Sequence, residues 1–161
     1  MRSLSAIVET IVKAEQVKTF EHIVPIDLKT IFTGYGPLPA VKSTRNQAGD
    51  WDTAGQTRTV NLTDGSSAQE LLTKYEYPNY FSYTVSGFTG VLRLLTTSAN
   101  GQWWFKSVAP EQTLVKWRYT FNARSVWTAP ILWFIATFLW RNYMRKALLL
   151  SQIQVERKLT Y

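Results

Sequence analysis

Hydrophobic and polar residues alternate along the chain from position 57 to position 86, as they do in half-buried β-strands. Val60 and Leu62 point to one face, whereas the polar residues between and beside them point to the other. The turn sequence Asp64-Gly65-Ser66 then reverses the chain, and a third strand at 80–86 adds three more residues to one face. These are Phe81, Tyr83 and Val85. The pattern predicts an antiparallel sheet with one apolar face.

The apolar face of the first hairpin carries one charge from each strand. Arg58 shares this face with Val60 and Leu62. A three-residue loop is expected to pair Leu62 with Ala68 and Val60 with Glu70, which leaves Glu70 diagonal to Arg58 on the same face. Such a buried pair either fixes the strand register at little net gain in stability, or anchors a carboxylate, phosphate or ketone on an apolar ligand.

A second hairpin is predicted at 101–124, where two alternating runs flank the turn Ala109-Pro110-Glu111. Large side chains occupy the inward positions of both strands. They are Trp103, Phe105, Val115, Trp117, Tyr119 and Phe121. Residues 91–99, just before this hairpin, fit either a strand or a helical turn.

From about position 126 to position 159 the hydrophobic period becomes 3.6 residues, which predicts a long helix with Pro130 in its first turn. Alanines on the packing face leave room between this helix and the sheet. That face comprises Trp133, Ala136, Trp140, Tyr143, Ala147 and Leu150. The opposite face carries Ile131, Phe134, Ile135 and Phe138, a larger apolar patch than a soluble monomer normally exposes. The uncharged run at 126–140 would be about 22 Å long as a helix, too short for a bilayer core of ~30 Å.

The first fifty residues are predicted to contain two helices and two strands. Residues 3–14 are predicted to form an amphipathic helix, whose apolar face comprises Leu4, Ile7, Val8, Ile11 and Val12. We expect this helix to cover the apolar face of the C-terminal helix, within the chain or across a homodimer, with a membrane surface as the competing cover. A strand at 16–24, a short helix at 27–33, a loop at 34–37 and a strand at 41–50 follow.

The composition narrows the class of protein. The 161 residues suffice for one domain, which we place at 16–161, with residues 1–15 as a helical extension. Aromatic residues make up 14% of the chain, so they form either an aromatic-rich core or the wall of a ligand cavity. The net charge of +7 comes from scattered basic residues, which argues against nucleic-acid binding. Cysteine and a signal-peptide core are lacking, so a cytoplasmic protein is expected.

The order of elements from about position 16 to position 155 resembles the START-like superfamily, in particular its bacterial polyketide cyclase/dehydrase-like (SRPBCC) members. The resemblance rests on Gly55-Gln56-Thr57-Arg58, Asp64-Gly65, Glu70, Phe81-Ser82-Tyr83, Gly101-Gln102-Trp103-Trp104-Phe105 and Trp117-Arg118-Tyr119-Thr120-Phe121. It implies an α+β helix-grip fold, in which a curved antiparallel sheet wraps around a long C-terminal helix after a short helical insertion. It also implies a hydrophobic cavity under that helix, open near the short helices and the loop at 34–39.

The sequence favours binding or carriage of a hydrophobic small molecule, whether lipid-like, polyketide-like or aromatic, because the chain has an aromatic interior and no catalytic or nucleotide-binding motif. We expect no cofactor. The ligand-binding residues are expected to be Arg58, Val60, Glu70, Phe81, Tyr83, Trp103, Phe105, Trp117, Tyr119, Phe121, Trp133, Ala136 and Trp140.

Two other functions remain open. One is a polyketide cyclase- or dehydratase-type enzyme that uses polar cavity residues, favoured if His22 or Tyr83 lies in the cavity beside Arg58. Its candidate catalytic residues are Arg58, Glu70, Tyr83 and His22, with Tyr119 as a further polar residue. Because His22 is the only histidine and cysteine is absent, no metal site is expected. The other function is a membrane-apposed or partner-binding protein.

Overall fold

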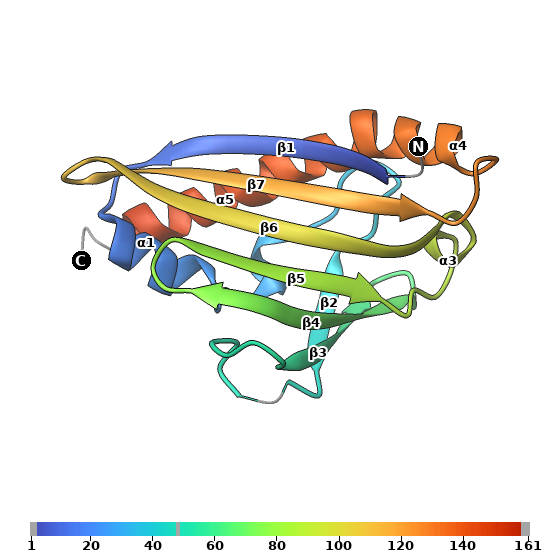
Figure 1. Cartoon of the computed structure of the whole chain (residues 1–161), viewed down its shortest axis with the longest axis horizontal. Helices are drawn as coiled ribbons and strands as arrows, with labels where there is room; N and C mark the ends of the chain where they lie inside the picture. The colour runs from blue at the N-terminus through green and yellow to red at the C-terminus, as the bar shows by residue number, and fades with distance from the viewer. Residues whose placement is uncertain (1–2, 48, 159–161) are drawn as a thin grey trace.

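The computed structural model, which describes residues 3–47 and 49–158, has a seven-stranded antiparallel sheet crossed by a long helical run (Figure 1). The strands lie in the order β1-β7-β6-β5-β4-β3-β2. They are β1 (Ser3–Val12), β2 (Val41–Arg45), β3 (Thr57–Leu62), β4 (Ser67–Glu76), β5 (Tyr80–Ser86), β6 (Thr96–Ala109) and β7 (Gln112–Ala123). The helices are α1 (Gln16–Ile23), α2 (Leu28–Ile31), α3 (Leu92–Leu95), α4 (Ala129–Phe134), the π-helix η1 (Ile135–Trp140) and α5 (Arg141–Lys158).

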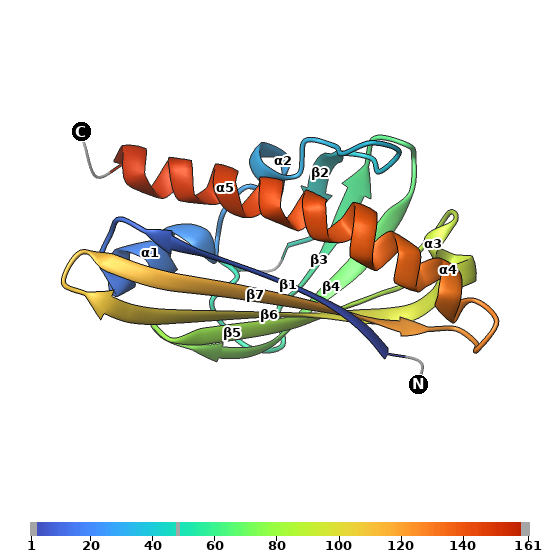
Figure 2. The same ribbon diagram turned by 90° about the horizontal axis from the view of Figure 1, so that it is seen from above.

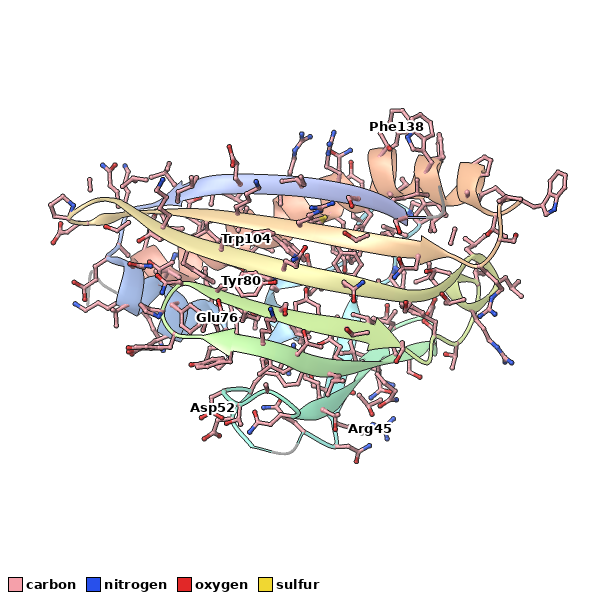
Figure 3. All side chains as sticks on the ribbon, in the orientation of Figure 1. Arg45, Asp52, Glu76, Tyr80, Trp104 and Phe138 are labelled. Carbon is pink, nitrogen blue, oxygen red and sulfur yellow. The ribbon has the colours of Figure 1, made fainter. Side chains whose placement is uncertain are left out.

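The run from α4 to α5 lies along one face of the curved sheet, which gives the α+β helix-grip arrangement that the sequence resemblance implied (Figure 2). The core between helix and sheet contains the inward aromatic residues of β5, β6 and β7. On the opposite face Tyr80 and Trp104 form a cross-strand pair with ring centroids 5.4 Å apart (Figure 3). The inward positions predicted for β5 and for the β6–β7 hairpin are confirmed.

The predicted N-terminal helix is wrong, because residues 3–12 form the edge strand β1, antiparallel to β7. Val8 and Val12 are buried, whereas Ile7 and Ile11 are exposed on the outer face. Val8 and Val12 are four residues apart. Residues at this spacing share one face of a helix and also one face of a strand, so both periods fit this short apolar run. The β-branched residues that dominate the segment favour the strand. The segment therefore does not cover the exposed face of the C-terminal helix as a helix.

The predicted strand at 16–24 is also wrong, because these residues form α1. Its buried residues are Thr19, Phe20 and Ile23, which share one face of a helix and would lie on both faces of a strand. Phe20 inserts between β4, β5 and β6, with its ring centroid 5.0 Å from that of Phe105. The helix predicted at 27–33 is present as the shorter α2, and the strand predicted at 41–50 ends at Arg45.

The first hairpin has the predicted loop length with a different register. The amide of Leu62 donates to the carbonyl oxygen of Ser66 at 2.9 Å, so the three-residue loop is Thr63-Asp64-Gly65. Gly65 has a φ of +88°, which glycine adopts without steric cost. Val60 consequently pairs with Ala68 instead of Glu70, and Arg58 lies directly opposite Glu70 rather than diagonal to it. The ambiguous segment at 91–99 contains both elements, α3 followed by the start of β6.

The C-terminal helix departs from the predicted packing face at Trp133, whose side chain is exposed. Leu132 and Ala136 face the sheet instead. The reason is η1, because each residue of a π-helical turn advances less far around the axis than in an α-helix. A period of 3.6 residues, applied backward from Trp140 through η1, therefore assigns Trp133 to the face that packs on the sheet, where Leu132 lies instead. The same effect moves Ile135 from the predicted exposed face to the packed side.

Candidate ligand cavity

A cavity of about 360 Å³ lies between η1 and the β3–β5 part of the sheet. Its floor is made by inward residues of the strands, its roof by η1 and the start of α5, and its two sides by the loops before α3 and before β2. The lining is mostly apolar. Its apolar lining residues include Leu38, Val60, Ala68, Val85, Leu92 and Leu139. The cavity lies under the last helix and beside the 34–39 loop, where the sequence resemblance implied it.

A smaller space of about 60 Å³ continues inward from this cavity among the aromatic residues of the core. Glu70, Tyr119 and Trp140 line both spaces, so the two are adjacent. Arg58 and Tyr83 line the inner space. The apolar cavity therefore ends in a small polar group held in aromatic surroundings.

The guanidinium of Arg58 is fixed by two contacts inside the fold. Its Nε donates to Oε1 of Glu70 at 2.8 Å, and both side chains are largely buried. Its Cζ lies 4.0 Å from the ring centroid of Trp51, a cation–π distance. Trp51 is buried and has a φ of +58°, an uncommon conformation for a bulky residue that the surrounding packing must impose. The bond to Glu70 uses only one of the five N–H donors of the guanidinium.

The two tyrosines at this polar end are neutral phenols. Burial raises the pKa of Tyr83 far above its usual value, and the negative charge of Glu70 raises it further. Burial likewise raises the pKa of Tyr119, with Tyr83 and Glu70 as smaller causes. Each phenol can therefore donate a proton in a hydrogen bond and cannot serve as a phenolate base near neutral pH.

Two indole N–H groups at the cavity have no hydrogen-bond partner within the described residues. They are the Nε1 atoms of Trp117 and Trp140, both buried, although the Trp117 N–H lies close enough to the Tyr83 phenol to lower the pKa of that group. Both residues line the inner space, and Trp140 also lines the larger cavity. A buried donor without an acceptor costs free energy, so this end of the cavity suits a molecule that brings an acceptor.

Tyr83 occupies space that Gly101 leaves free on the neighbouring strand. The two residues are cross-strand partners, and a Cβ on Gly101 would collide with the Tyr83 ring. We expect Gly101→Ala to lower the free energy of unfolding by about 1–3 kcal/mol, because the ring must leave its rotamer or the strands must separate. Urea unfolding measures this loss. In a Tyr83→Leu background the same change should cost clearly less; an equal cost in both backgrounds would show that the collision is not the cause.

Most of the predicted ligand-binding residues line one of the two spaces. Those that do are Arg58, Val60, Glu70, Phe81, Tyr83, Trp103, Trp117, Tyr119, Phe121 and Trp140. Phe105 and Ala136 are buried in the core without lining either space, and Trp133 is exposed.

His22 lies away from both spaces, on α1 near the end of α5. Partial burial lowers the pKa of its imidazole, and the positive charge of Lys158 adds to this effect. Of the two residues whose presence in the cavity beside Arg58 would favour an enzyme, Tyr83 lies there and His22 does not.

Several lining residues were not predicted from the sequence. They come from the short helices and loops, and include Ile31, Phe32, Pro37, Leu38, Phe88 and Leu92. Pro37 and Leu38 could have been predicted, because the sequence resemblance implied that the cavity opens beside their loop. Residues of α1 and α2 could not be found by strand alternation, since their inward faces follow helical spacing.

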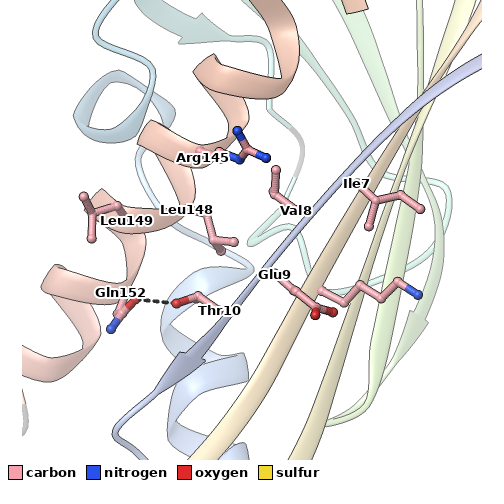
Figure 4. A pocket seen from close by; sticks show the side chains of 9 residues that line it. Ile7, Val8, Glu9, Thr10, Arg145, Leu148, Leu149 and Gln152 are labelled. Carbon is pink, nitrogen blue, oxygen red and sulfur yellow. Dashed lines mark hydrogen bonds between the residues drawn. The ribbon is translucent and has the colours of Figure 1, made fainter. Parts of the chain in front are cut away.

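A second depression lies outside the sheet, between β1 and α5 (Figure 4). It has a volume of about 540 Å³, and charged or polar side chains such as Glu9, Lys116 and Arg145 surround it. A hydrogen bond of 2.7 Å from Thr10 Oγ1 to Gln152 Oε1 crosses it. This groove is larger than the cavity under η1, but it is more open, and polar and apolar side chains line it about equally. We therefore place the candidate site in the mostly apolar cavity under η1.

Several solved structures have the same fold over nearly the whole length of this chain. Norcoclaurine synthase from Thalictrum flavum, a point mutant in complex with a transition state analogue, has a TM-score of 0.71 at 15% identity, over 97% of this chain and 96% of that one. XoxI from Bacillus cereus has a TM-score of 0.67 at 16% identity, over 98% and 99%. Major latex-like protein 151 from Panax ginseng has a TM-score of 0.66 at 13% identity, over 96% and 98%.

These similarities show that the chain has the helix-grip fold of these proteins. No family model matches the sequence, and no curated protein matches it. At this level of identity the likeness concerns the fold, and the function must be argued from the cavity itself.

Proposed function

We propose that the protein binds and carries a hydrophobic small molecule in the cavity under η1. The observation that carries this proposal is the combination of an apolar space of about 360 Å³ with unpartnered indole donors at its inner end. Ligand sites of this kind are concave, mostly apolar and supplied with a few polar groups that orient the ligand. The ligand would lie with its apolar body between Val60, Ala68 and Leu139.

The polar end of the cavity favours a neutral hydrogen-bond acceptor on the ligand. Glu70 already balances the charge of Arg58, so a second carboxylate there would be buried beside a like charge. A ketone or ester carbonyl needs only N–H or O–H donors, which Arg58 and the indole groups of Trp117 and Trp140 can supply. We therefore infer a lipid-like, polyketide-like or aromatic molecule with a carbonyl at one end.

The test is binding of a polarity-sensitive apolar dye, with displacement by a long-chain or aromatic ketone. Wild-type protein should bind about one dye per chain and lose tryptophan emission as it does so. Ala68→Phe places a ring in the cavity and should reduce dye affinity by at least about tenfold, since 360 Å³ has little room to spare. Leu71→Phe, on the outer face of the same strand, is the matched control and should bind normally. Equal binding by both variants would remove the cavity as the site.

A cyclase- or dehydratase-type enzyme is the second candidate, because Tyr83 lies in the inner space with Arg58 and Glu70. Its neutral phenol would donate a proton toward a substrate carbonyl. The norcoclaurine synthase of similar fold was solved with a transition state analogue, so this fold accommodates a reaction in that protein. Glu70 is engaged by Arg58 and His22 lies elsewhere, so a free base is lacking among these candidates, and carriage remains the leading proposal.

A further inference from the structure

Exposed aromatic and aliphatic side chains gather at one end of the molecule, on the loop before α4 and on α4 and η1. We call this the aromatic face, and it comprises Trp127, Ile131, Trp133, Phe134 and Phe138. Trp127 is 86% exposed, and the other four are each about half exposed. Figure 3 shows Phe138 on the side of the helix that points away from the sheet. Val91 and Leu94 extend the face onto α3, which contacts α4.

The charges around the aromatic face are positive. Arg93 on α3 and Arg124 at the end of β7 are exposed, and they are linked by a hydrogen bond of 2.8 Å from Arg124 Nε to the Arg93 carbonyl oxygen. Arg141 follows directly after η1. The sequence from α3 to η1 has a single acidic residue, Glu111, in the β6–β7 turn. Asp64, a carboxylate among the residues that line the cavity, accepts two hydrogen bonds from Ser66.

The aromatic face adjoins residues that line the cavity. Val91 belongs to the exposed surface and also lines the cavity. Ile135 and Leu139, on the inner side of η1, line the cavity as well, while Phe134 and Phe138 beside them in sequence face outward. A surface pressed against the aromatic face would therefore lie close to the cavity.

This combination suits the surface of a bilayer better than a second copy of the chain. In the described part of the chain, no helix is long and apolar enough to cross a membrane. Tryptophan and phenylalanine side chains partition into the interfacial layer of lipids, and nearby arginines are attracted to anionic headgroups. In a two-fold dimer through the same face, the positive surroundings formed by Arg93, Arg124 and Arg141 would instead meet the same positive charges of the second copy.

We propose that the aromatic face docks on the surface of membranes that contain anionic lipids and holds the cavity close to them. The docking proposal depends only on the exposed side chains and the charges around them. That the cavity then exchanges a lipid-soluble ligand with the membrane rests on the proposed function.

The experiment is sedimentation of the full chain with vesicles of phosphatidylcholine, with and without about a third phosphatidylserine. Wild-type protein should bind the anionic vesicles, and added salt should weaken binding because the arginine attraction is screened. The double variant Trp127→Ser, Phe134→Ser should lower the partition coefficient by at least about tenfold. Ile7→Ser, Ile11→Ser, which removes two partly exposed apolar side chains from β1, is the control for a general loss of surface hydrophobicity and should leave binding unchanged.

Three outcomes would overturn the proposal. The first is that wild-type protein fails to bind anionic vesicles, and the second is that the two double variants lose binding equally. The third is that wild-type protein sediments as a dimer that the aromatic-face variant turns into a monomer, which would assign the face to a second copy. Ala68→Phe separates this proposal from the proposed function, because filling the cavity should weaken dye binding and leave vesicle binding intact.

Discussion

Replacing Arg58 with methionine is expected to lower the free energy of unfolding by about 3–5 kcal/mol. The change leaves the Glu70 carboxylate buried without its partner, and it also removes the cation–π contact with Trp51. The double variant Arg58→Met, Glu70→Leu should be within about 1 kcal/mol of wild type, because two buried charges are replaced by apolar groups of similar size. Guanidinium unfolding of the three proteins gives these differences.

The Lys18–Glu15 pair provides the control for this experiment. Its charged atoms are 3.8 Å apart and both side chains are half exposed, so Lys18→Met should change stability by less than about 1 kcal/mol. If Arg58→Met proves as mild as Lys18→Met, the pair is not buried as described. Because the double variant should fold, its dye and ketone binding can be measured. Normal stability with weaker ketone binding would identify the pair as a ligand anchor.

Phe20→Ala is expected to be the most destabilising truncation in the N-terminal half of the chain, at about 3–5 kcal/mol. The Phe20 ring is fully buried and makes edge-on contacts with the rings of Tyr75, Tyr77 and Phe105. Removing it leaves a void where α1 meets the sheet.

Val17→Ala tests the same helix on its exposed side and should cost less than about 1 kcal/mol. Thermal or urea unfolding compares the two variants. The comparison also tests the helical assignment of α1, since a strand at 16–24 would align Phe20 with His22 and Val24 on one face. Similar losses for Phe20→Ala and Val17→Ala would contradict the packing of α1 described here.

The central strands could be predicted from the sequence because their alternation is long and one-sided. In β5 and in the β6–β7 hairpin, successive inward aromatic residues fit period two and no other period. The two N-terminal elements could not be predicted in the same way. Val8 and Val12 in β1 satisfy both periods, and α1 is short enough for its polar and apolar residues to imitate alternation.

The candidate site was predictable where it is built from strands. Arg58 was placed on the inward face by alternation and Glu70 by the expected pairing across the hairpin, although their direct pairing depended on a loop that closes at Ser66. Trp51 was not predicted as a partner of Arg58, because its position comes from an irregular loop with positive φ values. Trp133 was misplaced because a π-helical turn leaves no recognisable pattern in the sequence.

A crystal structure of the protein with a bound long-chain ketone tests the central claim most directly. We predict density for the ketone between η1 and the floor formed by Val60, Ala68 and Val85. Its carbonyl oxygen should lie within hydrogen-bonding distance of Arg58 or of the Nε1 atom of Trp117 or Trp140. Ketone bound in the groove between β1 and α5, with the inner cavity empty, would contradict the account.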